Sequence, residues 1–289
     1  RNPRLVYLYD FLKKKGLDVS IITCDFSHNE RIMRNTIKYK EEHEDYNIFF
    51  LHGYKYKKSV SIKRFMSQKK FANELKTWLR RNGNNYDAFY CPQPTSEATN
   101  VVEDYCANSN KKVIIDVRDI WPEAMKMFIK NDYLYTAIFG NYKKMVNKAY
   151  SRADAVVGVS EEYVSLALSV NKKSKDTAIV YQGVDVDEFD RGVAEFSSNI
   201  DKPKNEFWIT YAGKLGESYD LNTVIDGVKE LYNKGYTNLR FLILGKGPSE
   251  EKIRQHVSSS NAEAFVLFLV YKTYKEMALL ALGGIPSAA

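Results

Sequence analysis

The segment Asp116-Val-Arg-Asp-Ile-Trp-Pro-Glu123 gathers three carboxylates and an arginine within a short stretch. It directly follows the apolar run 113–115, which predicts a buried strand. Ligands of parallel α/β proteins bind beyond the carboxyl ends of strands. Arg118, Asp119 and Glu123 are therefore candidate catalytic residues in an active-site loop. The alternative is an ion pair between the arginine and an aspartate that closes the loop, with the tryptophan covering the core.

Two predicted strands further along the chain end in glycine, in Tyr211-Ala-Gly-Lys-Leu-Gly216 and in Leu244-Gly-Lys-Gly-Pro248. Glycine lets backbone amides approach a ligand closely, and amides at the start of a helix favour phosphate oxygens. A single glycine at a strand end is usually a tight turn, but two consecutive strand–helix units share the pattern, each followed by lysine. The candidate phosphate-binding residues are Gly213, Lys214, Gly216, Gly245, Lys246 and Gly247.

Residues 55–71 interleave lysines and arginine with aromatic and aliphatic side chains. Such a stretch can lie on an anionic bilayer with its rings in the interface, or hold a nucleic-acid backbone. It also fits an amphipathic surface helix whose apolar face is in the core. Between these alternatives the membrane and the surface helix are favoured over nucleic acid. The candidate membrane or acceptor surface comprises Lys57, Lys58, Lys63, Arg64 and Phe65.

Composition restricts the class of protein. A chain of 289 residues suits two domains, and 44% hydrophobic with 27% charged residues is a globular mixture. The net charge of +7 lies mostly in residues 1–195 and favours an anionic partner, although a solvated lysine-rich surface explains it equally well. Three cysteines at unrelated spacings form no disulfide framework and predict a cytoplasmic protein.

Other chemistries lack their motifs. The four histidines have no metal-ligand spacing, so we expect no metal and no cofactor. No GxSxG, HExxH or GxxxxGK[ST] pattern occurs, which argues against a nucleophile-elbow hydrolase, a zincin and a P-loop enzyme. No apolar run is long enough to cross a bilayer.

The elements that must position these residues alternate between strand and helix. Strands are predicted at 18–23, 46–51, 87–91, 111–117, 155–159 and 178–181, and helices at 5–15, 62–81, 95–106, 134–151 and 161–169. A helix opens the series with no strand before it, so we expect the first strand of this domain and its turn to be missing. The repeated pattern predicts a parallel sheet with right-handed crossovers.

A second α/β series follows residues 186–206, which are polar, show no periodicity and are interpreted as a linker. Its predicted strands are 208–213, 239–245 and 264–270, and its helices are 221–234, 250–257 and 274–282. The chain thus divides into a Rossmann-like domain at 1–185, the linker, and a second Rossmann-like domain at 207–289 that we expect to be incomplete.

The order and spacing of these segments resemble the retaining GT-B glycosyltransferases of family 4, in the subgroup that works on cell-surface polysaccharides. The resemblance covers nearly the whole chain and implies two Rossmann-like domains whose parallel sheets face a cleft. It makes 1–185 the acceptor-side domain and 207–289 the donor-nucleotide domain. The segments that carry it are Asn2–Arg4, Gly16–Thr23, Asp116–Glu123, Ala153–Glu161, Tyr181–Asp185 with Phe189, Tyr211–Gly216 and Leu244–Pro248.

The resemblance implies transfer of a sugar from a nucleoside diphosphate, with retention of configuration and no metal. It places Lys214 where the family has the first basic residue on the donor diphosphate, and the pair Arg118–Asp119 where many members have a histidine near both sugars. Gln182 stands in place of a usual asparagine, and Lys246 in place of a usual aspartate. Family members also carry a glutamate pair in a later region of the donor domain, which this sequence does not reach.

The sequence therefore predicts a nucleotide-sugar-dependent glycosyltransferase that acts on a lipid-linked or polysaccharide-precursor acceptor. It is expected in the cytoplasm, with the inner face of the cell membrane as an anionic partner and no nucleic acid as partner. Two alternatives stay open. One is a nucleotide-sugar epimerase of the same fold, and the other is a binding module that kept the fold and lost the chemistry.

Overall fold

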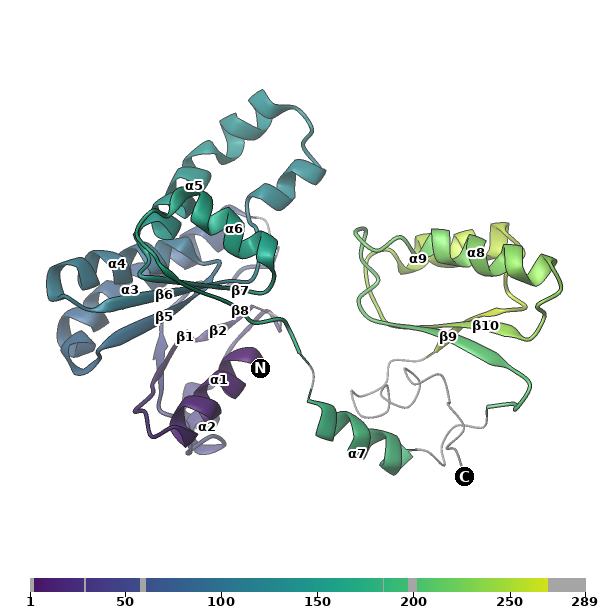
Figure 1. The fold of residues 1–289 in the computed structure, drawn as a ribbon, viewed down its shortest axis with the longest axis horizontal. Coiled ribbons are helices and arrows are strands. Elements are labelled where there is room, and N and C mark those ends of the chain that lie inside the picture. Colours follow the sequence, from purple (N-terminus) through teal and green to yellow (C-terminus); the bar gives the residue numbers. More distant parts are fainter. Residues whose placement is uncertain (1–2, 29, 58–60, 184, 197–201, 270–289) are drawn as a thin grey trace. The chain divides into compact units, whose positions relative to one another are not determined.

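The computed structural model describes residues 3–28, 30–57, 61–183, 185–196 and 202–269. The chain divides into two compact units, unit 1 over Arg1–Gln182 and unit 2 over Gly183–Ala289, and each is described by itself. Both contain parallel strands connected by helices (Figure 1). The helix predicted at 274–282 lies outside the described residues.

The main sheet of unit 1 has four parallel strands in the order β5-β6-β7-β8. A helix connects each strand to the next, which is the arrangement predicted from the alternating pattern. The strands are β5 (Ala88–Gln93), β6 (Lys112–Val117), β7 (Ala155–Gly158) and β8 (Asp176–Ile179), and the helices between them are α4 (Ser96–Ser109), α5 (Asp132–Arg152) and α6 (Glu161–Val170).

Two smaller sheets complete unit 1. Strands β1 (Ile21–Cys24) and β4 (Ile48–Leu51) pair in parallel, and the short strands β2 (Phe26–Ser27) and β3 (Ile32–Met33) pair antiparallel. The remaining elements are α1 (Pro3–Lys14), α2 (Thr36–Glu41), α3 (Ile62–Asn82) and the 3-10 turns η1 (Gly83–Asn85) and η2 (Glu123–Met127).

Side-chain caps start several of these helices. The Ser61 hydroxyl accepts a hydrogen bond from the backbone N–H of Arg64 at the start of α3, and Asn131 does the same for Leu134 at the start of α5. Such caps satisfy donors that the helix itself leaves unpaired and contribute about 1 kcal/mol each. The predicted Ser160 cap of α6 is confirmed, with Tyr163 as its N–H donor.

The core of unit 1 surrounds β6. Ile115, Val117 and Val156 have no exposed surface, and Leu79 of α3 and Ala167 of α6 pack in the same cluster. A central strand of a parallel sheet is covered on both faces, so its sequence reads as a continuous apolar run. This explains why β6 was recognisable from the sequence and why its carboxyl end, at Asp116, is held firmly.

Unit 2 has a parallel sheet in the order β11-β10-β9, formed by β9 (Phe207–Ala212), β10 (Leu239–Leu244) and β11 (Val266–Leu269). Helices α8 (Leu221–Asn233) and α9 (Glu250–Ser259) connect the strands and cover one face of the sheet. The central strand β10 is buried from Phe241 to Leu244. The predicted second α/β series is therefore present over the described residues.

The prediction of an aperiodic linker at 186–206 is wrong for its first half. Helix α7 spans Val186–Phe196 and belongs to unit 2. Its apolar residues Val186, Phe189, Val193 and Phe196 recur at helical spacing, and the Asp185 carboxylate accepts the N–H of Glu188 at the first turn. The many charged residues between them concealed this periodicity.

Smaller differences have local causes. Strand β5 was predicted to stop before Pro92 but continues to Gln93, because β5 is an edge strand of its sheet, where a missing N–H is tolerated. Strand β8 ends at Ile179, two positions before the predicted end. The short elements α2, β2 and β3 were not predicted, since elements this short carry little periodic signal.

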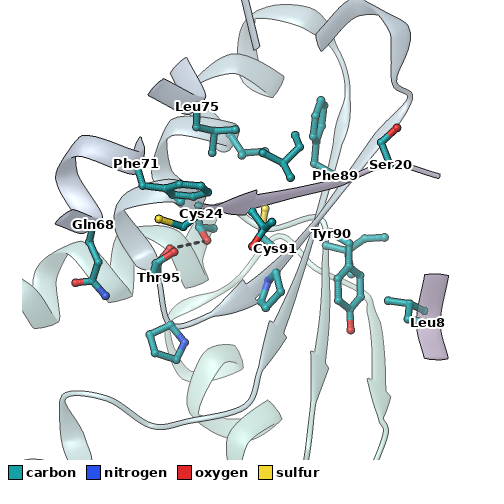
Figure 2. A pocket seen from close by; sticks show the side chains of 18 of the residues that line it. Leu8, Ser20, Cys24, Gln68, Phe71, Leu75, Phe89, Tyr90, Cys91 and Thr95 are labelled. Atoms are coloured by element: carbon teal, nitrogen blue, oxygen red, sulfur yellow. Dashed lines mark hydrogen bonds between the residues drawn. The ribbon is translucent and has the colours of Figure 1, made fainter. Parts of the chain in front are cut away.

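A cavity of about 1180 Å³ lies between the two parallel sheets of unit 1. Strands β1 and β5 both line it, and among the described residues each pairs on one side only, β1 with β4 and β5 with β6. Figure 2 shows Phe71 and Leu75 of α3 at one side of this cavity and Leu8 of α1 at another. The cavity is thus bounded by two strand edges and two helices.

Candidate functional site

The carboxyl end of β6, just before the candidate catalytic loop, carries a fully buried carboxylate. The Asp116 side chain has no exposed surface, and the guanidinium of Arg4 donates two hydrogen bonds to it, each of 2.9 Å. Arg4 also donates to the backbone oxygen of Val180, just after β8, at 2.8 Å. Burial and the charge of Asp116 raise the pKa of Tyr90 in the same cluster. Asp116 therefore holds α1 and the strand ends together and is not free for chemistry.

Arg118 lies beside this pair without joining it closely. Its Nε is 3.9 Å from Asp116 and has no hydrogen-bond partner among the described residues, although the side chain is only 19% exposed. Burial lowers the pKa of Arg118, and the Asp116 carboxylate opposes that effect. The predicted ion pair exists only as this long contact, so the Arg118 side chain, which lines the cavity, keeps donor capacity for a ligand.

Asp119 is the residue of the loop whose carboxyl is both reachable and perturbed. The residue is exposed, while burial of its carboxyl raises the pKa above the usual range for aspartate. A hydrogen bond from the Ile120 N–H and the charge of Arg64 act in the opposite direction. Arg64 of α3 and Arg118 of this loop both line the cavity. A carboxylate with a raised pKa is a candidate base.

Glu123 is occupied differently from the other two predicted catalytic residues. It begins η2, its side chain is 19% exposed, and its carboxylate forms a 3.1 Å ion pair with Lys143 of α5. The Trp121 ring packs edge-on against Phe139 of the same helix. Glu123 therefore fastens the loop to α5, whereas Arg118 and Asp119 remain available to a substrate.

The predicted basic surface is divided by the fold. Lys57 and Lys63 are exposed, Arg64 lines the cavity, and Phe65 packs edge-on against Tyr142 of α5 at a centroid distance of 5.6 Å. Lys58 lies outside the described residues. The segment thus places one arginine beside the candidate catalytic loop and its exposed lysines on the outside.

A cluster of one histidine, one tyrosine and one arginine at the same cavity was not predicted from the sequence. The Nδ1 of His28 lies 2.7 Å from the Tyr56 hydroxyl and 3.0 Å from the Arg31 guanidinium. Burial and the charges of Arg31 and Arg64 lower the pKa of His28, which favours the neutral ring. No spacing rule joins His28 to Tyr56, since one follows β2 and the other follows β4, and the parallel pairing of β1 with β4 sets these segments side by side.

In unit 2 the two predicted glycine loops lie against each other. The N–H of Gly213 donates to Leu244 at 2.9 Å, and the N–H of Leu215 donates to Lys246 at 3.1 Å. A side chain on Gly245 would place its Cβ 1.9 Å from the Gly213 oxygen, and one on Gly247 would meet the Leu215 oxygen at 2.0 Å. Both glycines are required for the close approach of one loop to the other.

This packing changes the expected part played by the backbone. The N–H groups of Gly213, Leu215 and Gly216 are donated to protein carbonyls, so they are not available to phosphate. The Tyr211 hydroxyl donates to the Lys214 carbonyl at 2.8 Å and stiffens the loop. The Lys214 and Lys246 side chains are exposed, and neither amine belongs to an ion pair among the described residues.

Ser249 is a further polar residue at these loops that the sequence did not single out. It precedes the first residue of α9, is 7% exposed, and its hydroxyl has no hydrogen-bond partner in the described part of the chain. Its own N–H donates to the Leu215 carbonyl at 3.1 Å, which ties α9 to the first loop.

No helix over the described ranges is long and apolar enough to cross a membrane, and no metal-binding group of acidic, histidine or cysteine side chains occurs there.

Solved structures resemble this fold along most of the chain. HepE from Anabaena in complex with UDP is 13% identical over 91% of this chain and 71% of its own, with a TM-score of 0.60. Sucrose-phosphate synthase from Thermosynechococcus elongatus is 12% identical over 91% of this chain and 73% of its own, with a TM-score of 0.59. A glycosyltransferase from Rickettsia africae is 15% identical over 94% of this chain and 65% of its own, with a TM-score of 0.55.

At these identities the likeness establishes the fold. The chain has a GT-B-like α/β fold with parallel sheets, as the sequence predicted. Neither the models of known protein families nor the curated proteins give a match to the sequence. The fold and the two groups of loops are therefore what an assignment of function must rest on.

Proposed function

We propose that the protein is a glycosyltransferase that moves a sugar from a nucleoside-diphosphate-sugar to an acceptor with retention of configuration. The fold supports this proposal, since HepE with the same fold has been solved with UDP and with UDP-glucose. The observation that carries it is in unit 2. Two glycine-rich loops lie side by side at the carboxyl ends of β9 and β10, and each presents an exposed lysine.

Unit 2 holds the donor in this proposal. The Lys214 amine and, next to it, Lys246 would neutralise the diphosphate as the bond between its oxygen and the anomeric carbon breaks. Charge stabilisation of a leaving group is effective when the cation is held in place beforehand, and the Tyr211 hydroxyl fixes the Lys214 backbone. The Ser249 hydroxyl lacks a hydrogen-bond partner among the described residues, and in this proposal it donates a hydrogen bond to the same ligand or accepts one from it.

Unit 1 holds the acceptor. Asp119, with its raised pKa, accepts the proton of the acceptor hydroxyl or orients that hydroxyl as the new bond to the anomeric carbon forms. Arg118 supplies an unpaired N–H to a negatively charged or hydroxyl-bearing part of the substrate. Glu123 positions the loop through Lys143. We propose a lipid-linked or polysaccharide-precursor acceptor, met at the inner face of the cell membrane.

Calorimetric titration tests the donor site directly. We expect the protein to bind at least one of UDP, GDP and ADP, and Lys214→Ala to weaken that binding at least tenfold, which corresponds to about 1.4 kcal/mol. Lys234→Ala is the matched control, since this exposed lysine follows α8 at the opposite end from the loops and pairs with Glu230. Unchanged affinity of Lys214→Ala would remove this lysine from the phosphate site.

Product analysis tests the reaction. Incubation with a nucleotide sugar should release nucleoside diphosphate only when an acceptor fraction is present. Release of an altered free sugar without acceptor would instead assign an epimerase. Binding of none of the three nucleotides would instead assign a binding module that has lost the chemistry.

A further inference from the structure

Residues 127–138 expose more large apolar surface than any other short segment of unit 1 that the structure describes. Met127 is 61% exposed, Phe128 59%, Tyr133 91%, Leu134 52% and Ile138 54%. Single exposed apolar side chains are ordinary, but a contiguous group of this size marks an interaction surface. These five residues are called the α5 patch below.

Three residues of the patch, Tyr133, Leu134 and Ile138, lie on the exposed side of α5, and Met127 and Phe128 come just before this helix, at the end of η2. Tyr135, Phe139 and Tyr142 of α5 are at most 9% exposed and form its packed side, with Trp121 edge-on against Phe139. Because inner and outer residues alternate at helical spacing, Leu134 and Ile138 cannot turn inward without expelling this packed row. The exposure of the patch is therefore fixed by the fold.

Basic residues border the patch. Lys126 lies over the Tyr135 ring at 5.1 Å, Lys130 is exposed in the turn before α5, and Lys144 is exposed further along the helix. Asp132 is the single acidic residue between Lys126 and Lys144, and it pairs with Lys126 at 3.4 Å. This composition suits the interface of an anionic bilayer. Apolar side chains enter the acyl-chain region, aromatic side chains lie at its boundary, and lysines contact the anionic headgroups.

The start of α3 lies against the packed side of α5 and exposes apolar residues of its own. Phe65 packs on Tyr142, which sets the first turns of α3 beside α5, and there Ile62 is 80% and Met66 53% exposed. Exposed Lys63 lies between them. Figure 1 shows the first half of α5 and the segment before it extending beyond the rest of unit 1. A projecting helix end can enter a bilayer interface without burying the body of the unit.

We propose that the α5 patch seats the protein on an anionic membrane surface. The loop with Asp119 precedes the patch by only a few residues and is tied to α5 through Glu123 and Lys143. Seating the patch therefore brings the candidate acceptor loop to the level of the headgroups. Membrane binding needs no catalysis, so this proposal and the proposed glycosyl transfer stand or fall separately.

Vesicle flotation tests the proposal. Wild-type protein should float with phosphatidylglycerol–phosphatidylcholine vesicles and bind pure phosphatidylcholine vesicles less tightly. The double variant Leu134→Asp/Ile138→Asp should lose at least tenfold in partition coefficient, with circular dichroism confirming that it is folded. Ile37→Asp is the matched control, because Ile37 is 72% exposed on α2, away from the patch. Equal partition of the double variant and the control would overturn the proposal.

A second measurement locates the contact. The Tyr133→Trp variant should show a blue shift of its added fluorescence on mixing with the anionic vesicles, whereas Ile37→Trp should not. Gel filtration tests the alternative that a second copy of the chain binds the patch. A wild-type dimer that Leu134→Asp/Ile138→Asp converts to a monomer, without vesicle binding by either, would make the patch an interface between copies and refute the membrane.

Discussion

The Arg4 guanidinium and the Asp116 carboxylate form a two-point ion pair, with both hydrogen bonds at 2.9 Å and the carboxylate wholly buried. It joins the first turn of α1 to the carboxyl end of β6, and the Val180 carbonyl accepts a third hydrogen bond from the same guanidinium. Bidentate geometry of this kind is specific to arginine and fixes orientation as well as distance. The pair thus sets the position of the loop that carries Arg118 and Asp119.

Loss of Arg4 should be costly for folding. Arg4→Met leaves a buried carboxylate without its partner, and breaking such a pair from one side costs about 3–5 kcal/mol. Restoring neutrality with Arg4→Met/Asp116→Asn should recover part of this loss. Urea unfolding of the single and double variants measures both values. A double variant less stable than Arg4→Met would show that the charge of Asp116 is satisfied by other groups.

Asp119 should control the acidic limb of the pH profile. To accept a proton it must be ionised, and its pKa is raised by burial, so activity should fall as the pH drops through that raised pKa. Asp119→Asn should lower kcat about 100-fold or more and abolish this limb. Asp132→Asn, at an 82% exposed side chain nearby, is the control. A retained acidic limb in Asp119→Asn would assign it to another group.

The regular part of the fold was predictable because local rules dominate it. The apolar run Val113–Ile115 predicted strand β6. The glycines after β9 and β10 predicted the two loops that the structure brings together. The purpose of Gly245 and Gly247 was not predictable. Their close contacts are with the carbonyls of Gly213 and Leu215, and a contact with a distant backbone leaves the same glycine in the sequence as a contact with a ligand.

Contacts between residues far apart in the chain could not be predicted from the sequence. Arg4 and Asp116 are 112 positions apart, and no periodicity or spacing relates them. The same holds for His28 with Tyr56, which lie on segments brought side by side by the pairing of β1 with β4. Glu123 was predicted to be catalytic because it follows β6 closely in the sequence. Its ion pair with Lys143 depends on where α5 lies, which the sequence does not show. A local pattern finds the loop, and tertiary packing decides which of its side chains are free.

Glu103 gives the fold a pH dependence that is separate from the site. This glutamate of α4 is 3% exposed, and burial raises its pKa to about 8 against the opposing charge of Arg152. The folded state therefore holds the proton more tightly than the unfolded state. The stability that this proton contributes is fully present below the ordinary glutamate pKa and is lost as the pH rises towards 8.

Substitution of Glu103 should reveal this dependence. Glu103→Gln mimics the protonated form, so its melting temperature should exceed that of the wild type by a few degrees at pH 8.5 and by much less at pH 5, close to the ordinary glutamate pKa. Glu44→Gln, at an exposed position, should show no such pH-dependent difference. Thermal unfolding at the two pH values measures both variants. An equal difference at pH 5 and 8.5 would mean that Glu103 is ionised in the folded protein throughout.

The edges of β1 and β5 predict that unit 1 can take up one more parallel strand. Both edges line the cavity between the sheets, and apolar side chains such as Phe71, Leu75 and Leu8 cover it (Figure 2). Helix α1 starts at the carboxyl edge of the sheet, because Arg4 in its first turn reaches Asp116. A segment that enters α1 from this edge would run parallel to both strands, as in a right-handed strand–helix unit.

An N-terminal extension tests this prediction. About six β-branched apolar residues followed by a short glycine turn, placed before Arg1, should pair with both edges and join the two sheets into one. We expect the melting temperature to rise by about 5 °C or more, with slower amide exchange at Ile22 and Phe89, which line the cavity from β1 and β5. The matched control carries two prolines within the added segment, which remove N–H donors from the ladder. Equal stability of the two versions would show that the strand edges do not accept a partner.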